Sequence, residues 1–139
     1  MRYLGLDLGT KTLGVALSDK TNTIATFHKV IRYNEEMETL IPELQKIIKE
    51  NEITEIALGL PKNMNNSLGF ASKRSLKFKK IIEENIIGVK VNLVDERLTT
   101  VEATNYLLEG SLSRKKRKKV VDGVAASIIL DTFLKMKGD

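Results

Sequence analysis

Cysteine and tryptophan are absent from the 139-residue chain, and proline occurs only twice. The absence of cysteine excludes disulfides, thiolate zinc sites and a cysteine nucleophile, and it fits a reducing compartment. Two prolines, nine glycines and no long polar tract argue against an internal linker. No apolar run approaches the roughly 18 residues that span a membrane, and the N-terminus has no signal-peptide pattern. We therefore expect one globular domain over residues 1–139, located in the cytoplasm.

Positive charge is concentrated in two places. The chain has 23 Lys and Arg against 18 Asp and Glu, and six of these cations are consecutive at Arg114–Lys119. A second group lies on a predicted helix: Lys73, Arg74, Lys77, Lys79 and Lys80. Each cluster alone has an ordinary explanation as solvated surface. Together they favour binding to a phosphate backbone, which depends on summed ionic contacts. With few aromatic residues in the chain, no base-stacking platform is expected.

A carboxylate interrupts the apolar run YLGLDLG at residues 3–9. If Arg2–Gly9 is a strand, side chains alternate between its faces, so Leu4, Leu6 and Leu8 share one face and Asp7 shares the other with Tyr3 and two glycines. Asp and Gly are also common where a strand ends in a turn, which is the ordinary explanation for Asp7. Glycine inside a strand, however, often marks close approach by a backbone or ligand. Alternation therefore indicates that Asp7 lies beside open space.

The order of apolar segments predicts an α/β fold with a five-stranded mixed sheet. We expect a three-strand antiparallel meander followed by two parallel strands, with helices on both faces. The expected strands are Arg2–Gly9, Leu13–Ser18, Asn22–Ile31, Glu55–Leu60 and Gly88–Val94. The expected helices are Glu36–Glu50, one that ends near Glu84 and buries Phe70, Ala71, Phe78, Ile81 and Ile82, one from Thr99 to before Gly110, and Lys118–Met136, which follows a basic loop.

Acidic residues occur at comparable places in three of these elements. Asp7 lies in the first strand, Asp95 and Glu96 close the last strand, and Asp122 precedes the apolar part of the final helix. Asp122 shares a helical stripe with Ala125, Ala126, Ile129 and Phe133, and the small alanines would let this stripe approach the bare strand face. An acid in a first helical turn also stabilises the helix dipole by about 0.3–1 kcal/mol, but that explanation suits an exposed residue rather than one on a buried stripe.

Clustered carboxylates would need a counterion. At an effective dielectric of 20, two carboxylates about 4 Å apart repel by on the order of 4 kcal/mol, so such a cluster binds protons or a divalent cation. Oxygen ligands alone suit Mg²⁺ or Mn²⁺. The single histidine, His28, lies in a different segment, which makes a histidine-based nuclease less attractive.

Four segments carry a resemblance to a known family. GLDLGTKTLGVALSD, GLPKNMNNS, VDERLTTVEA and RKKRKKVVDGVAA occur in the order seen in the YqgF/RuvX family, whose members are described as Holliday-junction resolvases and as pre-16S rRNA nucleases. The resemblance covers almost the whole chain and implies an RNase H-like fold and a bacterial cytoplasmic location. Asn66, Leu68, Phe70 and Asp131 depart from the residues usual in the family.

The resemblance implies a catalytic, metal-binding triad of Asp7, Asp122 and one acid at the end of the last strand. We favour Glu96, because Asp95 shares alternation with Val89, Val91 and Leu93, and we keep Asp95 as a further candidate ligand. The implied cofactor is Mg²⁺ or Mn²⁺. The residues expected to contact nucleic acid are Lys11, Lys73, Lys77, Arg97, Arg114, Lys115, Lys116, Arg117, Lys118 and Lys119.

These features predict a metal-dependent hydrolase that cleaves phosphodiester bonds in structured nucleic acid, with 5′-end processing of pre-16S rRNA as the implied role. The alternatives are a Holliday-junction-type DNA resolvase, a non-catalytic nucleic-acid-binding module, and an actin-like or sugar-kinase-like ATPase lobe. The ATPase is least favoured, because such proteins enclose the nucleotide between two lobes and this chain supplies one. A monomer or a weak homodimer is expected, without membrane association.

Overall fold

A five-stranded sheet forms the centre of the computed structural model, which describes residues 2–34, 36–61, 69–95 and 114–138 and, within the last range, side chains only for 125–137. The strands lie in the order β3-β2-β1-β4-β5. β1, β2 and β3 form an antiparallel meander, and β4 and β5 run parallel to β1. The predicted mixed sheet is thereby confirmed. The strands span Arg2–Leu8 (β1), Thr12–Ser18 (β2), Ala25–Arg32 (β3), Ile53–Leu60 (β4) and Lys90–Asp95 (β5).

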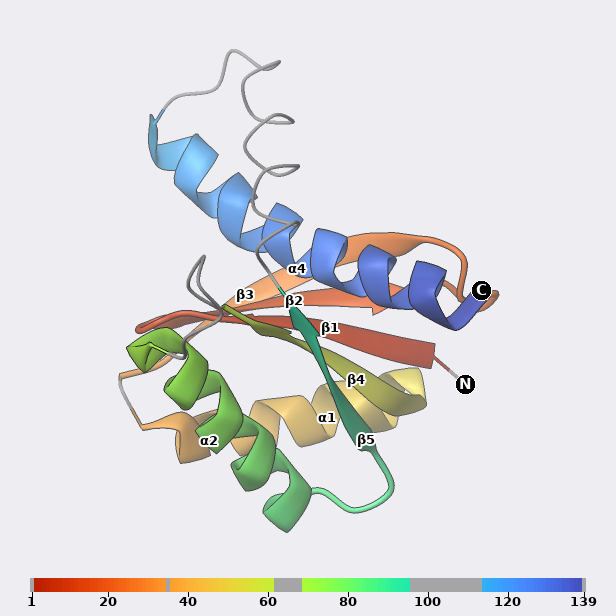
Figure 1. Ribbon diagram of the computed structural model, residues 1–139, viewed down its shortest axis with the longest axis horizontal. Coiled ribbons are helices and arrows are strands. Elements are labelled where there is room, and N and C mark those ends of the chain that lie inside the picture. The colour runs from red at the N-terminus through yellow and green to blue at the C-terminus, as the bar shows by residue number, and fades with distance from the viewer. Residues whose placement is uncertain (1, 35, 62–68, 96–113, 139) are drawn as a thin grey trace.

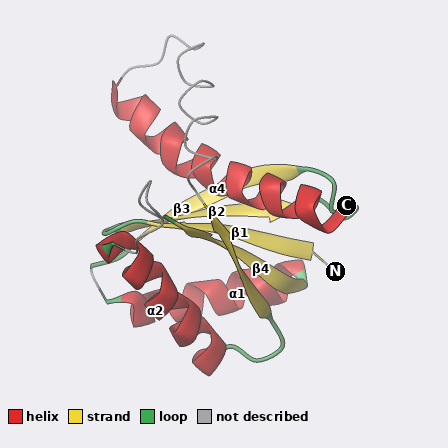
Figure 2. Ribbon diagram, viewed as in Figure 1, coloured by secondary structure: helices red, strands yellow, loops and turns green. Residues whose placement is uncertain are grey.

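Helices cover both faces of this sheet (Figure 1). The short 3-10 helix η1 (Met37–Leu40), α1 (Ile41–Asn51) and α2 (Phe70–Asn85) lie on one face, and the long helix α4 (Arg114–Gly138) crosses the other (Figure 2). Pro42 lies in the first turn of α1, where its missing N–H costs no helical hydrogen bond. The helix predicted from Thr99 lies outside the described residues. Within the described part of the chain, no helix is long and apolar enough to cross a membrane.

The two faces of the sheet are packed by different kinds of side chain. Toward α1 and α2, large strand residues such as Leu4, Leu6 and Ile56 are fully buried with Phe78 of α2. Toward α4, the strands present small residues, and the bulk comes from the helix. The buried residues of that second cluster are Ala16, Ala57, Val94, Ala126, Ile129, Leu130, Phe133 and Leu134. α4 therefore packs on the strand face that alternation predicts to lack large side chains.

Gly5 shows how closely α4 approaches β1. A Cβ atom at Gly5 would lie 2.6 Å from the Leu130 Cβ and 2.8 Å from the Ala126 carbonyl oxygen. Distances this short do not occur between real side chains and backbone, so the strand must have glycine here to hold the helix in this position.

Two details of the predicted helices are wrong. Phe70, expected to be buried, is 86% exposed, and Ala71 beside it is exposed as well. Phe70 is the first residue of α2 and lies eight residues before Phe78, so at about 100° per residue its side chain points about 80° away from the buried face. The inward positions are instead Ser72 and Ser75, whose hydroxyls have no hydrogen-bond partner among the described residues.

The basic segment is the second difference. Arg114–Lys119, predicted as a loop, forms the first turns of α4, which begins four residues before the expected Lys118. Lys and Arg are good helix formers, and no glycine or proline separates them from the apolar part of the helix. The unfavourable position of cations at a helix N-terminus did not prevent helix formation here.

Glu52 offers a test of the local backbone. It ends α1 with φ 53° and ψ 46°, the left-handed conformation that favours glycine, and its side chain is exposed. We expect Glu52→Gly to raise the free energy of unfolding by about 1 kcal/mol, because a side chain in this conformation is strained. Thermal and urea denaturation would measure the change. The matched control is Glu50→Gly inside α1, which should lower the free energy of unfolding by about 1 kcal/mol. A Glu52→Gly protein less stable than the wild type would contradict the prediction.

Candidate active site at the carboxyl edge of the sheet

Two of the predicted acids, Asp7 and Asp95, lie at one edge of the sheet. β1, β4 and β5 are parallel, so their carboxyl ends share an edge, the usual place for ligands in such sheets. Asp7 is the last but one residue of β1, and Asp95 is the last residue of β5. The topology thus brings the predicted acids of two distant segments to the same edge, with β4 between them.

Asp7 has glycines on both neighbouring strands. It pairs with Gly14 of β2. On the other side Leu6 pairs with Leu58, so Gly59 follows in β4 at the level of Asp7. The Asp7 side chain is half-buried. The residues beside it on the two neighbouring strands are glycines, so Gly14 and Gly59 place no side chain directly beside the Asp7 carboxylate in the sheet.

Two contacts give the register of α4 along the first part of β1. Tyr3 and Phe133 are in edge contact with ring centroids 5.8 Å apart, and Gly5 lies against Leu130 and Ala126. Each step of two residues along β1 therefore matches about one turn back along α4, since two strand residues span about 7 Å and one turn about 5.4 Å. Asp122 lies one turn before Ala126 in α4, as Asp7 lies one step beyond Gly5. The Asp122 side chain is outside the described residues.

The opposite end of α4 is held by an ion pair. Lys137 pairs with Glu55 of β4, and its Nζ lies 5.0 Å from the centre of the Tyr3 ring. Burial raises the pKa of Glu55, but hydrogen bonds from Lys137 and Asn92 outweigh it and leave the pKa below its usual value. The same bond raises the pKa of Lys137. These contacts hold the C-terminal part of α4 close to the sheet, and the N-terminal part of the helix rises away from the strands (Figure 1).

Asp95 lies on the other face of the sheet from Asp7. Its pairing partner is Leu60, and it follows Val91 and Leu93, which contact the core beneath α1 and α2. The alternate residue Val94 packs in the cluster beneath α4. Glu96 and Arg97, which follow, are outside the described residues. The choice of Glu96 as the middle acid, the member of the triad between Asp7 and Asp122 in the sequence, therefore stays a prediction.

The remaining predicted residues are scattered over the surface. Lys11 is exposed in the turn between β1 and β2, and Lys73 and Lys77 are exposed on α2. The side chains of residues 114–119 are not among those described. His28 lies on β3, is largely exposed, and is separated from β1 by β2. Partial burial of its ring and the positive charges of Lys29 and Arg2 lower the pKa of His28. Among the described side chains, no three acidic or histidine residues form a metal-binding group.

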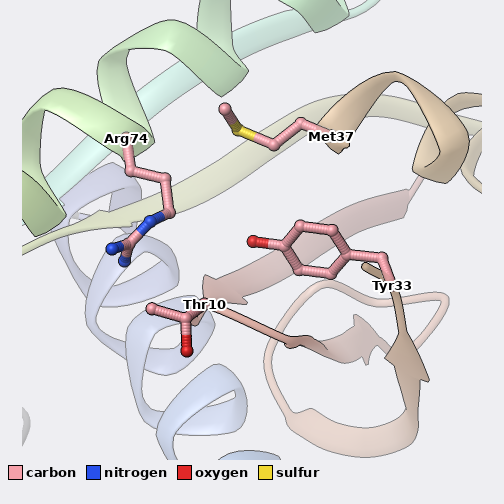
Figure 3. Close-up of a pocket in the computed structure, with 4 residues that line it drawn as sticks. All are labelled: Thr10, Tyr33, Met37 and Arg74. Carbon is pink, nitrogen blue, oxygen red and sulfur yellow. The ribbon is translucent and has the colours of Figure 1, made fainter. Parts of the chain in front are cut away.

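A pocket near Asp7 was not predicted from the sequence. Its volume is about 210 Å³, and it is lined by Thr10, Tyr33, Met37 and Arg74 (Figure 3). The Tyr33 hydroxyl donates a hydrogen bond to the carbonyl oxygen of Gly9, two residues after Asp7. Helical geometry could have singled out Arg74, which lies about 40° from Phe78 around α2, whereas Lys73 lies about 140° away.

The sequence is similar to one protein family along almost its whole length. The model of a family described as RuvX, Holliday junction resolvase, matches residues 1–136. A Staphylococcus epidermidis protein named "Putative pre-16S rRNA nuclease" is 46% identical over 134 residues, covering 96% of this chain and 94% of that protein. A Leuconostoc mesenteroides protein of the same name is 49% identical over 140 residues, covering 99% and 97%.

The fold is similar to that of a solved resolvase. T. thermophilus RuvC in complex with a Holliday junction substrate matches with a TM-score of 0.62, covering 99% of this chain and 96% of that one. The sequence identity is only 15%, so this match concerns the fold alone. It confirms the predicted RNase H-like architecture.

Proposed function

This chain belongs to the RuvX Holliday junction resolvase family, and on that premise we propose that it is a nuclease that processes the 5′ end of pre-16S rRNA. Its reaction is hydrolysis of phosphodiester bonds in structured nucleic acid. The structural observation that supports this best is Asp7, a carboxylate at the carboxyl edge of the sheet with a glycine on each side. The substrate and role rest on the names of the full-length relatives.

Asp7, Glu96 and Asp122 are proposed as the catalytic carboxylates. The register of α4 on β1 supports Asp122, because the helix runs toward Asp7 with about one turn for every two strand residues. The strand alternation supports Glu96 over Asp95, since Val94 lies on the α4 face and Asp95 follows Leu93 on the opposite face.

The donor set fits a divalent metal ion. All three groups are carboxylates, which suit a hard cation that keeps some of its water ligands, and Gly14 and Gly59 place no side chain directly beside Asp7. Mg²⁺ or Mn²⁺, when bound by Asp7, Glu96 and Asp122, would polarise the attacking water and stabilise negative charge on the phosphate. Half burial of Asp7 in a sheet row restricts the direction in which its oxygens can point, which preorganises the site.

Basic residues near the carboxyl edge are proposed to position the substrate. Lys11 projects from the turn that follows Asp7, and Lys73 and Lys77 are exposed on α2. Arg97 and residues 114–119 are expected to add further phosphate contacts. Such contacts are salt-dependent and independent of sequence, so specificity for the rRNA precursor must come from its shape.

Cleavage assays with two substrates test the proposal. We expect the protein to cleave an end-labelled fragment of pre-16S rRNA in Mg²⁺ or Mn²⁺ and to leave it intact in EDTA, because three carboxylates without a metal ion cannot activate water at a phosphate. A four-way DNA junction serves as the second substrate. Metal-independent binding without cleavage of either substrate would instead indicate a non-catalytic binding module.

A junction resolvase is the second candidate, favoured by the description of the matched family. A resolvase must cut two strands in a coordinated way, which requires a dimer, whereas an rRNA nuclease can act as a monomer. We propose a monomer or a weak homodimer in the cytoplasm. Sedimentation with and without a four-way junction distinguishes the two states, and symmetric cleavage of the junction by a dimer would favour the resolvase.

A further inference from the structure

The pocket lined by Thr10, Tyr33, Met37 and Arg74 lies next to the strand end that carries Asp7 (Figure 3). It is built from four separate elements: the β1–β2 turn, the segment after β3, η1 and α2. Tyr33 contacts the Gly9 carbonyl oxygen, and Gly9 is two residues, or about 7 Å along an extended chain, from Asp7. Tyr33 and Met37 pack with the core beneath α1 and α2, whereas Asp7 faces α4, so the pocket and Asp7 are neighbours along the carboxyl edge on opposite faces of the sheet.

Arg74 supplies a cation that the protein does not neutralise within the described part of the chain. The described ion pairs join Lys29 to Glu43, Lys79 to Glu83, Lys80 to Glu84, Lys135 to Asp131 and Lys137 to Glu55, and Arg74 takes part in none of them. Its guanidinium points from α2 toward Thr10 (Figure 3). Unlike the exposed Lys73 and Lys77, Arg74 is half-buried, so its position is restricted. A planar guanidinium held in this way is suited to a phosphate.

The other wall of the pocket is aromatic and apolar. The Tyr33 backbone N–H donates to the Lys11 carbonyl oxygen at 3.0 Å, and the Tyr33 hydroxyl donates to the Gly9 carbonyl oxygen. The backbone and the hydroxyl of Tyr33 are thus both hydrogen-bonded to the turn that follows Asp7. Met37 is buried beside it and contributes an adaptable thioether. A binding site for a free anion needs only the polar wall. A nucleotide has a phosphate that suits the polar wall and a base whose faces suit the aromatic and apolar wall.

We propose that this pocket binds one unpaired nucleotide of a strand that crosses the carboxyl edge, with its phosphate on Arg74 and Thr10 and its base against Tyr33 and Met37. The volume of about 210 Å³ is below the roughly 300–1,000 Å³ of small-molecule sites, which suits a single base. Bases in an A-form duplex are stacked and paired, and only a splayed-out base can enter a protein pocket. The enzyme would therefore favour structured substrates that have an unpaired end or bulge.

This inference rests on the proposed nuclease function for the identity of the bound strand as substrate, but it is tested by binding alone. Fluorescence anisotropy in EDTA measures the dissociation constants of a short single-stranded oligonucleotide, as RNA and as DNA, and of a blunt RNA duplex. We expect Arg74→Gln to weaken single-strand binding about tenfold, because it removes a charge-assisted contact. The slope of log affinity against log salt should fall in magnitude by about 0.7, the value for one phosphate contact to a single strand.

Lys90→Gln is the matched control. It removes one positive charge from an exposed residue at the start of β5, at the edge of the sheet opposite to Asp7. We expect it to change single-strand affinity less than about twofold, since the long-range effect of one charge is screened by salt. Thr10→Val, an exposed turn position, is a second test that leaves the helix intact and should weaken single-strand binding about threefold. Melting temperatures verify that each variant is folded.

The outcomes separate the inference from the proposed function. Weaker binding of single strands but not of the duplex by Arg74→Gln supports the pocket, even if the protein cleaves no substrate. Equal loss for single strand and duplex, or a loss no larger than that of Lys90→Gln, would show that Arg74 adds only general positive charge and would overturn the inference, even if the nuclease assay succeeds.

Discussion

Asp7→Asn should lower the rate of metal-dependent RNA cleavage about a thousandfold at saturating substrate, since removal of one metal-binding carboxylate is expected to cost roughly 4 kcal/mol of transition-state stabilisation. The amide has almost the same shape as the carboxylate, so the sheet around Asp7 should keep its structure. Single-turnover cleavage over a range of Mg²⁺ concentrations measures the effect. Cleavage by the variant at the wild-type rate would remove Asp7 from the mechanism.

Two further variants make this test specific. Asp131→Asn removes a carboxylate from α4 that pairs with Lys135 at 3.0 Å, and it should cleave at nearly the wild-type rate. Asp95→Asn tests the face on which the middle acid lies. Because Asp95 follows Leu93 on the face away from α4, its replacement should reduce the rate far less than Glu96→Gln does. The reverse order would make Asp95 the middle acid.

Gly5→Ala should destabilise the protein by about 3 kcal/mol and lower its melting temperature by about 10 °C. The added methyl would lie 2.6 Å from the Leu130 Cβ and 2.8 Å from a backbone oxygen of α4, and neither atom is at the end of a flexible side chain. The helix must therefore move away from the sheet. Thermal denaturation measures the loss, and cleavage at low temperature should also fall because α4 carries Asp122.

Gly9→Ala is the control for this substitution. A Cβ at Gly9 would meet its nearest neighbours, two oxygens of Thr12, at 3.4 Å, close to ordinary contact. We expect a change in stability below about 1 kcal/mol, typical of a substitution that meets no severe clash. If Gly5→Ala were no more destabilising than Gly9→Ala, the close seating of α4 on β1 would be contradicted.

Local geometry explains why much of the fold was predictable. The bare strand face around Asp7 follows from alternation, which holds in any strand, and the buried stripe of α4 follows from helical periodicity. Ala126, Ile129 and Phe133 are buried as that stripe predicts. The position of β4 between β1 and β5 was not predicted, because strand order depends on long-range pairing that no local pattern encodes.

The errors also have local causes. Phe70 was assigned to the core because it is aromatic, but its place in the first turn of α2 turns it toward solvent. The pocket at Tyr33 could not be predicted from the count of aromatic residues, because a count does not give the position of any one of them. The hydrogen bond from Tyr33 to Gly9 joins residues 24 positions apart, and the pocket that it shapes exists only after the meander has formed.

The packing of α4 on the sheet has a consequence for the stage of folding at which activity would appear. This helix packs on β1, β2 and β3, and β4, α2 and β5 lie between those strands and the helix in the sequence. Until it docks, the small-residue face of the sheet is uncovered, and the proposed set of carboxylates, which includes Asp122, is incomplete. On the proposed function, a chain in which α4 has not yet docked would therefore not cleave RNA.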